Sequence, residues 1–167
     1  MRKYRTASLT GVTDAVRRDD AKLQAWFAFL QAHDAATESL DVDLRARTGL
    51  TLSDYEVLLH LSGSPGSALR MTDLAASVLL SPSGTTRAVD RLERNALVRR
   101  GPDPDDGRAT LVSLTPSGRR RFRAAAPVHL AGVRARFLDA ITKREADALR
   151  AISVKVLAAN GRDERLL

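Results

Sequence analysis

Cysteine is absent from this sequence of 167 residues, and so are long apolar runs. Without cysteine the chain forms no disulfides, thiolate nucleophiles, iron-sulfur clusters or cysteine-based zinc sites. No segment approaches the roughly 18 consecutive apolar residues of a membrane span, and the basic N-terminus lacks the apolar stretch of a secretory signal. The sequence therefore predicts a cytoplasmic protein that does not associate with a membrane.

Motifs for catalysis and for metal binding are also absent. The sequence has no glycine-rich phosphate loop, no HExxH and no GxSxG. Its three histidines, His33, His60 and His129, are too far apart for a local metal motif such as a helical i, i+4 pair. We therefore expect no enzymatic activity, no metal and no cofactor.

The positive charge is almost all arginine and is concentrated in one part of the chain. The 27 basic residues include only four lysines and exceed the 20 acidic residues by 7. This arginine bias fits a nucleic-acid partner and equally fits a GC-rich genome, so the location of the charge must decide. Residues 82–123 hold ten arginines and five acids, a net +5 of the total +7. This quarter of a single globular domain is the candidate nucleic-acid interface.

The longest periodic segment predicts a helix from about Asp20 to Arg47. Its seam residues recur at alternating spacings of three and four: Leu23, Trp26, Leu30, His33, Thr37, Leu40 and Leu44. Gly49 stops this helix. A second, mostly buried helix begins after Thr51 or Ser53, each of which has an acidic residue three positions later.

Two further helices follow with a short turn between them. Thr72 is the expected cap of a helix of about two turns, and Ser81 followed by Pro82 caps the next. The second of these has a buried face and a cationic face, and we expect Asn95 to end it in a left-handed conformation.

The pattern then changes to a β-hairpin and two more helices. Apolar strands over residues 97–100 and 108–114 flank a polar tip rich in proline and aspartate. Thr115 and Pro116 open a helix that runs to about Asp139, with a kink expected at Pro127. Thr142 and Glu145 form a capping box for a last helix to about Ala159.

This order of elements is that of a winged helix-turn-helix in a mainly α fold. The segment LSPSGTTRAVDRLERNALVRRGPDPDDGRATLVSLTPSGR, residues 80–119, resembles the MarR family of bacterial transcription regulators, and the similarity covers roughly Leu23 to Ala159. Its most specific parts are NALVRR and the hairpin DPDDGRATLVSLTPSG. One departure is Ala96, where many members have glycine; we expect Asn95 to supply the turn instead.

The resemblance implies a homodimeric repressor or activator that binds duplex DNA at a pseudo-palindromic operator. Residues 21–48 and 116–160 would form a helical dimerisation region, and residues 49–115 a winged helix-turn-helix lobe that binds DNA. Residues 1–20 would be an N-terminal extension and residues 161–167 a C-terminal tail. Independently, the seam of the first helix is longer than a small lobe can cover, which favours burial against a second subunit.

The first turns of the helix after Ser81 are the expected reader of DNA, because backbone N–H groups and hydroxyls there meet phosphates and base edges. The residues predicted to bind DNA are Ser81, Ser83, Gly84, Thr86, Arg87, Arg91, Asp106 and Arg108. We favour capping for Ser81, and we expect Thr85 to be partly buried. Arg108, beside the hairpin tip, is expected to enter the minor groove, oriented by a hydrogen bond from its guanidinium to Asp106.

A ligand pocket is the least specific prediction. Trp26, His33, Tyr55 and His129 offer flat apolar surface with few polar groups, and arginine-rich surroundings favour an anionic aromatic effector that relieves repression. The alternative reading of the whole chain is a winged-helix interaction module that binds protein or RNA; salt dependence and duplex preference would separate the two.

Overall fold

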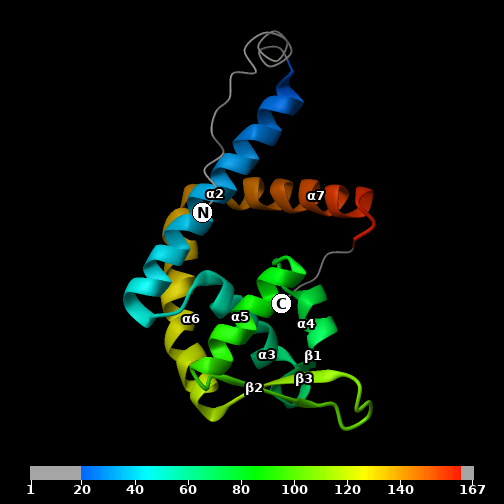
Figure 1. Ribbon diagram of the computed structural model, residues 1–167. Helices are drawn as coiled ribbons and strands as arrows, with labels where there is room; N and C mark the ends of the chain where they lie inside the picture. Colours follow the sequence, from blue (N-terminus) through cyan, green and yellow to red (C-terminus); the bar gives the residue numbers. More distant parts are fainter. Residues whose placement is uncertain (1–19, 163–167) are drawn as a thin grey trace, which may run out of the picture. The chain divides into compact units, whose positions relative to one another are not determined.

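The computed structural model describes residues 20–162, coloured along the chain in Figure 1. The chain divides into two compact units, with the boundary between Thr37 and Glu38. Within residues 20–162 no helix has both the length and the apolar character needed to cross a membrane.

The described residues are mainly helical and include one small sheet. The helices are α2 (Ala21–Thr48), α3 (Leu52–Gly63), α4 (Met71–Ser77), α5 (Pro82–Arg94), α6 (Pro116–Arg136) and α7 (Lys143–Ala159), with short 3-10 turns η1 (Pro65–Ser67) and η2 (Leu138–Ala140). The strands are β1 (Ala68–Arg70), β2 (Val98–Pro102) and β3 (Thr110–Leu114). The predicted helices and hairpin are confirmed, and α6 continues past Pro127 but ends at Arg136, before Asp139.

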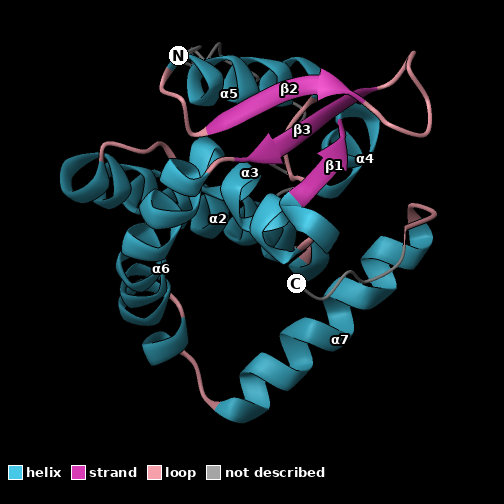
Figure 2. Ribbon diagram, turned by 90° about the horizontal axis from the view of Figure 1, so that it is seen from below, coloured by secondary structure: helices cyan, strands magenta, loops and turns pink. Residues whose placement is uncertain are grey.

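The sheet has a third strand that the sequence did not indicate. β3 lies between β1 and β2 and is antiparallel to both, as Figure 2 shows. Leu69 of β1 pairs with Val112 of β3, and Arg100 of β2 pairs with the same residue from the other side. Because β1 is followed directly by α4, its pairing with β3 connects the hairpin to the start of α4.

Most of the predicted helix caps are confirmed. Thr51 and Asp54 form a capping box at α3, the Ser81 hydroxyl accepts the N–H of Gly84 at α5, and Thr142 with Glu145 caps α7. The prediction for Thr72 is wrong, because α4 already begins at Met71 and its N-cap is Arg70, without a side-chain cap. β1 leads directly into α4, which leaves no loop residue to act as a cap.

The prediction for the end of α5 is also wrong. Asn95 has an ordinary φ of −90°, and the left-handed residue is Ala96, with a φ of 55°. The Asn95 side chain instead donates its Nδ2–H to the carbonyl of Arg91, at 2.8 Å. The chain therefore turns at the position where the MarR family often has glycine, with alanine in the strained conformation.

The core lies between α3, α4, α5 and the sheet. Its fully buried side chains include Leu58 and Leu61 of α3, Leu74 of α4, Leu92 of α5 and Val112 of β3. The predicted partial burial of Thr85 is in fact complete burial within this core. The opposite, polar face of α5 is exposed.

The junction between the hairpin and α6 is packed backbone to backbone. Thr115 donates both its N–H and its hydroxyl to the carbonyl of Leu97, and its hydroxyl also accepts the N–H of Gly118. A Cβ at Gly118 would overlap the same carbonyl oxygen of Leu97. This close approach explains a glycine in the first turn of α6.

The N-terminal part of α2 and the whole of α7 differ from the core in burial. In α2 burial begins at Leu40, whereas Trp26, Phe29 and Leu30 are exposed. α7 has no buried residue, and its apolar residues Ile152 and Val156 are exposed.

Candidate nucleic-acid interface

The first turns of α5 present a row of polar side chains. Ser81, Ser83, Thr86 and Arg87 are exposed. The Ser81 hydroxyl lies 3.1 Å from the backbone nitrogen of Gly84 and 3.3 Å from the hydroxyl of Ser83. Capping by Ser81 is confirmed, and Ser83, Thr86 and Arg87 are available for a partner at a helix N-terminus, which attracts anions.

Gly84 has a structural reason of its own. A Cβ at this position would lie 3.1 Å from the Ser81 hydroxyl oxygen and 3.6 Å from the Cβ of Leu80. A side chain would therefore crowd the cap of α5. The space left by Gly84 serves the cap, and close approach of DNA to its backbone stays a prediction.

Several arginines of the basic region are bound within the molecule. Arg91 pairs with Asp54 of α3, and Arg100 of β2 pairs with Asp90 and Glu93 of α5. Arg119 donates to the Ser67 hydroxyl, and Arg121 donates to the carbonyl of Thr48. These arginines hold the fold together, so the charge of residues 82–123 overstates the charge offered to a partner.

Other arginines are free to meet a polyanion. Among residues 20–162, the guanidinium groups of Arg87 in α5, Arg99 in β2 and Arg108 beside the hairpin tip have no hydrogen-bond or ion-pair partner, and all three side chains are exposed. The exposed cations therefore sit on the helix and on the hairpin that the winged helix-turn-helix would use.

The base of the hairpin is held by a buried carboxylate. Asp103, with a side chain only 7% exposed, accepts the backbone N–H of Asp105 at 2.8 Å and pairs with Arg70 of β1 at 2.5 Å. The hydrogen bond from the Asp105 backbone, together with Arg70, lowers the pKa of the Asp103 carboxyl. Asp103 thus shapes the turn through the backbone of Asp105, and its ion pair with Arg70 ties the hairpin to the start of α4.

Asp106 acts on the backbone of the tip. Its Oδ1 accepts the backbone N–H of Arg108 at 3.1 Å, and its carbonyl accepts the N–H of Ala109 at 2.8 Å. The expected hydrogen bond from the Arg108 guanidinium to Asp106 is not formed among the described residues. Asp106 sets the turn from which the Arg108 side chain extends.

A second ion pair connects the hairpin to α5. Glu93 accepts the backbone N–H of Arg100 and pairs with its guanidinium, and these hydrogen bonds lower the pKa of the Glu93 carboxyl. Arg100 also reaches Asp90, at 2.7 Å. The orientation of the hairpin relative to α5 is thus set by charged groups at their junction.

Sequence reasoning missed Asp54, Arg70, Arg100 and Asp103 as a set of ion-pairing residues. Arg70 and Asp103 are 33 positions apart and Arg91 and Asp54 are 37 apart. Only the fold brings them together. The one local signal was an acidic residue at the third position of α3, which was read as a cap and not also as an ion-pair partner.

The predicted ligand residues form two aromatic groups, each within its own unit. In α2, the rings of Trp26 and Phe29 are 6.2 Å apart and those of Phe29 and His33 are 6.3 Å apart. In the second unit, Tyr55 of α3 stacks on His129 of α6 with ring centroids 4.3 Å apart. Phe29 is an aromatic neighbour that the sequence prediction omitted.

In the stacked pair Tyr55 is buried, His129 is half-buried, and one ring nitrogen of His129 lacks a partner among the described residues. Burial raises the pKa of Tyr55 and lowers the pKa of His129. Nδ1 of His129 is buried without a hydrogen-bond partner among the described residues. A buried polar atom without a partner is uncommon and marks this place as one where a ligand or a water would be stabilised.

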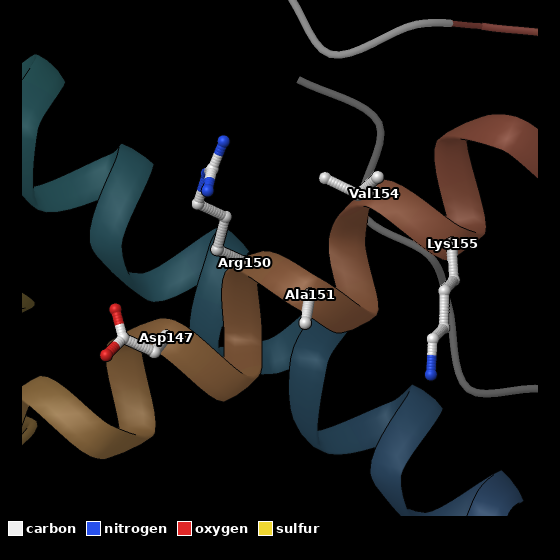
Figure 3. Close-up of a pocket in the computed structure, with 5 residues that line it drawn as sticks. All are labelled: Asp147, Arg150, Ala151, Val154 and Lys155. Carbon is white, nitrogen blue, oxygen red and sulfur yellow. The ribbon is translucent and has the colours of Figure 1, made fainter.

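A separate hollow lies along α7. It is lined by Asp147, Arg150, Ala151, Val154 and Lys155, as Figure 3 shows. All five residues belong to α7, and no other element among residues 20–162 lines this hollow. It has no residue in common with the predicted ligand site.

The comparisons with known proteins agree with this architecture. The family model described as "MarR family" matches residues 48–109. HTH-type transcriptional repressor MdtR of Bacillus subtilis is 30% identical over 146 residues, which is 86% of either chain. An uncharacterised HTH-type regulator of the same organism, YdgJ, is 33% identical over 86 residues, and the match spans only about half of its length (51%).

Among solved structures, Sco3205 of Streptomyces coelicolor, described as a MarR family transcriptional regulator in complex with DNA, has a TM-score of 0.78. It is 32% identical, and the match covers 84% of this chain and 88% of that one. The likeness therefore includes the lobe and the helices that flank it.

Proposed function

The chain belongs to the MarR family, and on this basis we propose that it is a transcriptional regulator that binds duplex DNA as a homodimer. The observation that carries the proposal is the pairing of an exposed polar N-terminus of α5 with free arginines on α5 and on the hairpin. The positive charge of these arginines attracts the phosphate backbone of DNA, and an α-helix fits into the major groove.

The two elements have different proposed roles. Ser83, Thr86 and Arg87 of α5 contact base edges and phosphates in the major groove, with Ser81 and Gly84 at the helix start. Arg108 enters the adjacent minor groove, where a guanidinium meets enhanced negative potential. Asp106 contributes by holding the tip in the turn that extends Arg108.

The homodimer supplies the second reading head. Exposed apolar residues on α2 and on α7 support pairing with a second copy. A two-fold dimer places its two α5 helices about one DNA turn apart, ~34 Å, and therefore selects a pseudo-palindromic site.

Repression and its relief are the finer part of the proposal. The relative MdtR is named a repressor, and we extend that role to this chain. An anionic aromatic compound bound at the Tyr55 and His129 pair, or separately at the Trp26 and His33 group of α2, would release DNA if it favours one spacing of the reading heads over the other. The unpartnered Nδ1 of His129 supports a polar contact at such a site.

Titration of DNA tests the proposal. A duplex selected from a random library is titrated at several salt concentrations, beside a scrambled duplex and a single-stranded RNA of equal length. We expect preference for the selected duplex, a steep salt dependence, and a loss of about 1–3 kcal/mol in Arg108→Ala. Equal affinity for RNA, or no duplex preference, would instead favour the interaction module.

A further inference from the structure

We propose that Arg91 is a positioning residue for DNA binding: its ion pair with Asp54 sets the orientation of α5 on α3, and its guanidinium does not contact DNA. The inference rests on the proposed function and assigns a role within it. It replaces the sequence-based prediction that placed Arg91 among the DNA contacts. The reason lies in what the side chain already binds.

The Arg91 guanidinium is directed to the start of α3. Its Nε and Nη2 lie 3.2 Å and 2.9 Å from Oδ1 of Asp54, and Nη2 lies 3.4 Å from the hydroxyl of Thr51. Both acceptors belong to the capping box of α3. One guanidinium thus binds the two side chains that define where α3 begins.

Asp54 cannot easily give up this partner. Its side chain is only 8% exposed, and its Oδ2 already accepts the backbone N–H of Thr51 at 3.1 Å. Turning Arg91 toward DNA would leave Oδ1 of a buried carboxylate without its cation, which is strongly unfavourable. The Arg91 guanidinium is therefore held by Asp54 and is not free for a DNA contact.

The same turn of α3 is also held from α2. Oδ1 of Asp41 accepts the backbone N–H of Leu52 at 2.8 Å, and Oδ2 of Asp41 pairs with Arg45. The first turn of α3 is thus bound by α2 through Asp41 and by α5 through Arg91. The orientation of α5 is therefore linked, through the start of α3, to the C-terminal part of α2.

Arg87 provides a matched contrast, because it lies one helical turn before Arg91 on α5. Its side chain is exposed, and its guanidinium has no partner among residues 20–162. A phosphate contact by an arginine contributes about 0.9 to the slope of log affinity against log salt. Arg87 should contribute to that slope, and Arg91 should not.

The experiment compares Arg91→Lys, Arg91→Ala, Asp54→Asn and the control Arg87→Ala in the full chain. Affinity for the selected duplex and for a scrambled duplex is measured at several salt concentrations. We expect each change at Arg91 or Asp54 to lower affinity for the selected duplex at least tenfold, with the salt slope and the scrambled-duplex affinity unchanged. Arg87→Ala should make the slope of log affinity against log salt less negative by about 0.9.

Arg91→Lys separates positioning from contact without removing charge. Lysine keeps a positive charge for a phosphate contact but replaces the Nε and Nη2 pair that binds Oδ1 of Asp54 by one nitrogen on a flexible stem, so positioning predicts a loss of selectivity in this variant. The proposal would be overturned by near-wild-type binding of Arg91→Lys. It would also be overturned if the salt slope of Arg91→Ala became less negative by about 0.9. Thermal melts confirm that each variant is folded at the temperature of the titration.

The combined variant Arg91→Ala with Asp54→Asn completes the test. Positioning by one ion pair predicts that the double change costs no more affinity than the worse single change. Additive losses would show that Arg91 and Asp54 act separately and would overturn the inference. Failure of the wild-type chain to bind any duplex would show instead that the proposed function itself is wrong.

Discussion

The lobe that we propose binds DNA differs from the outer parts of its flanking helices in the burial of apolar residues. In the lobe, residues 49–115, Val57, Leu58 and Leu74 are fully buried. In the flanking helices, Trp26 is 51% exposed and Ile152 is 58% exposed. Leu44 of α2 and Ala125 of α6 complete the core of the lobe, whereas the N-terminal part of α2 and the whole of α7 leave apolar side chains exposed, as a surface that associates with another chain would. Changes in the lobe should therefore alter unfolding, and changes in the exposed faces should alter association.

The largest effect on stability is expected from Gly118→Ala, at the junction between the hairpin and α6. The added methyl would overlap the carbonyl oxygen of Leu97, a backbone atom held in place by the N–H and the hydroxyl of Thr115. We expect the free energy of unfolding to fall by more than about 3 kcal/mol, since overpacking against rigid backbone is relieved only by moving an element. Urea unfolding followed by circular dichroism measures the change.

Gly132→Ala is the matched control for this change. Its Cβ would lie 2.7 Å from Cδ2 of Leu40, the end of a flexible side chain that can shift. We expect a loss of about 1 kcal/mol. Equal losses in the two variants would contradict the rigid junction inferred at Leu97.

The exposed face of α7 should respond in association instead. Ile152→Glu places a charge within the apolar surface that we propose a second copy covers, and an unpaired charge buried in an interface is unfavourable. We expect the dimer dissociation constant to rise about 100-fold, equivalent to about 2.8 kcal/mol. Sedimentation equilibrium measures it, and circular dichroism should show a lobe that is still folded.

Lys155→Glu is the control on the same helix. It changes the charge by more than Ile152→Glu does, but it replaces one exposed polar side chain by another. Its dissociation constant should stay within a few-fold of the wild-type value. A larger effect from Lys155→Glu would show that charge, and not apolar contact, governs assembly.

His129 gives the second unit a dependence on pH. Burial lowers the pKa of His129 in the folded chain, so the unfolded chain binds more protons between the two pKa values. The folded state therefore has its full stability above the unfolded pKa of about 6.5 and loses stability as the pH falls below it. We expect the free energy of unfolding to fall between pH 7.5 and pH 5.5, measured by urea unfolding at fixed ionic strength.

His129→Phe should remove this pH dependence and keep the stacking on Tyr55. His33→Phe is the control, because His33 is exposed on α2. If the wild-type pH dependence persisted in His129→Phe, the proton would bind elsewhere. The test also bears on the proposed ligand, since a compound bound at Nδ1 should lose affinity in His129→Phe.

Local signals predicted more of this structure than distant ones. Thr51, Ser81 and Thr142 each cap a helix through a hydrogen bond to a residue three positions later, so these caps could be predicted from the local sequence. β1 is three residues long and its pairing partner lies more than 40 positions away, so no periodicity revealed it. The partner of Arg91 lies 37 positions away, so its role was assigned from charge alone.

The smallest predicted effect, and the only gain of stability among these predictions, is at Ala96. Its φ of 55° is a left-handed conformation that costs an L-residue about 1 kcal/mol and costs glycine much less. Ala96→Gly should therefore raise the free energy of unfolding by about 0.5–1 kcal/mol, after allowance for the greater freedom of glycine in the unfolded chain. Asn95→Gly is the control and should be destabilising, because Asn95 has a φ of −90° and its side chain donates to the Arg91 carbonyl. The gain belongs to the lobe alone, so the dimer dissociation constant should not change. If Asn95→Gly raised the free energy of unfolding and Ala96→Gly did not, the left-handed residue at this turn would be Asn95 and not Ala96.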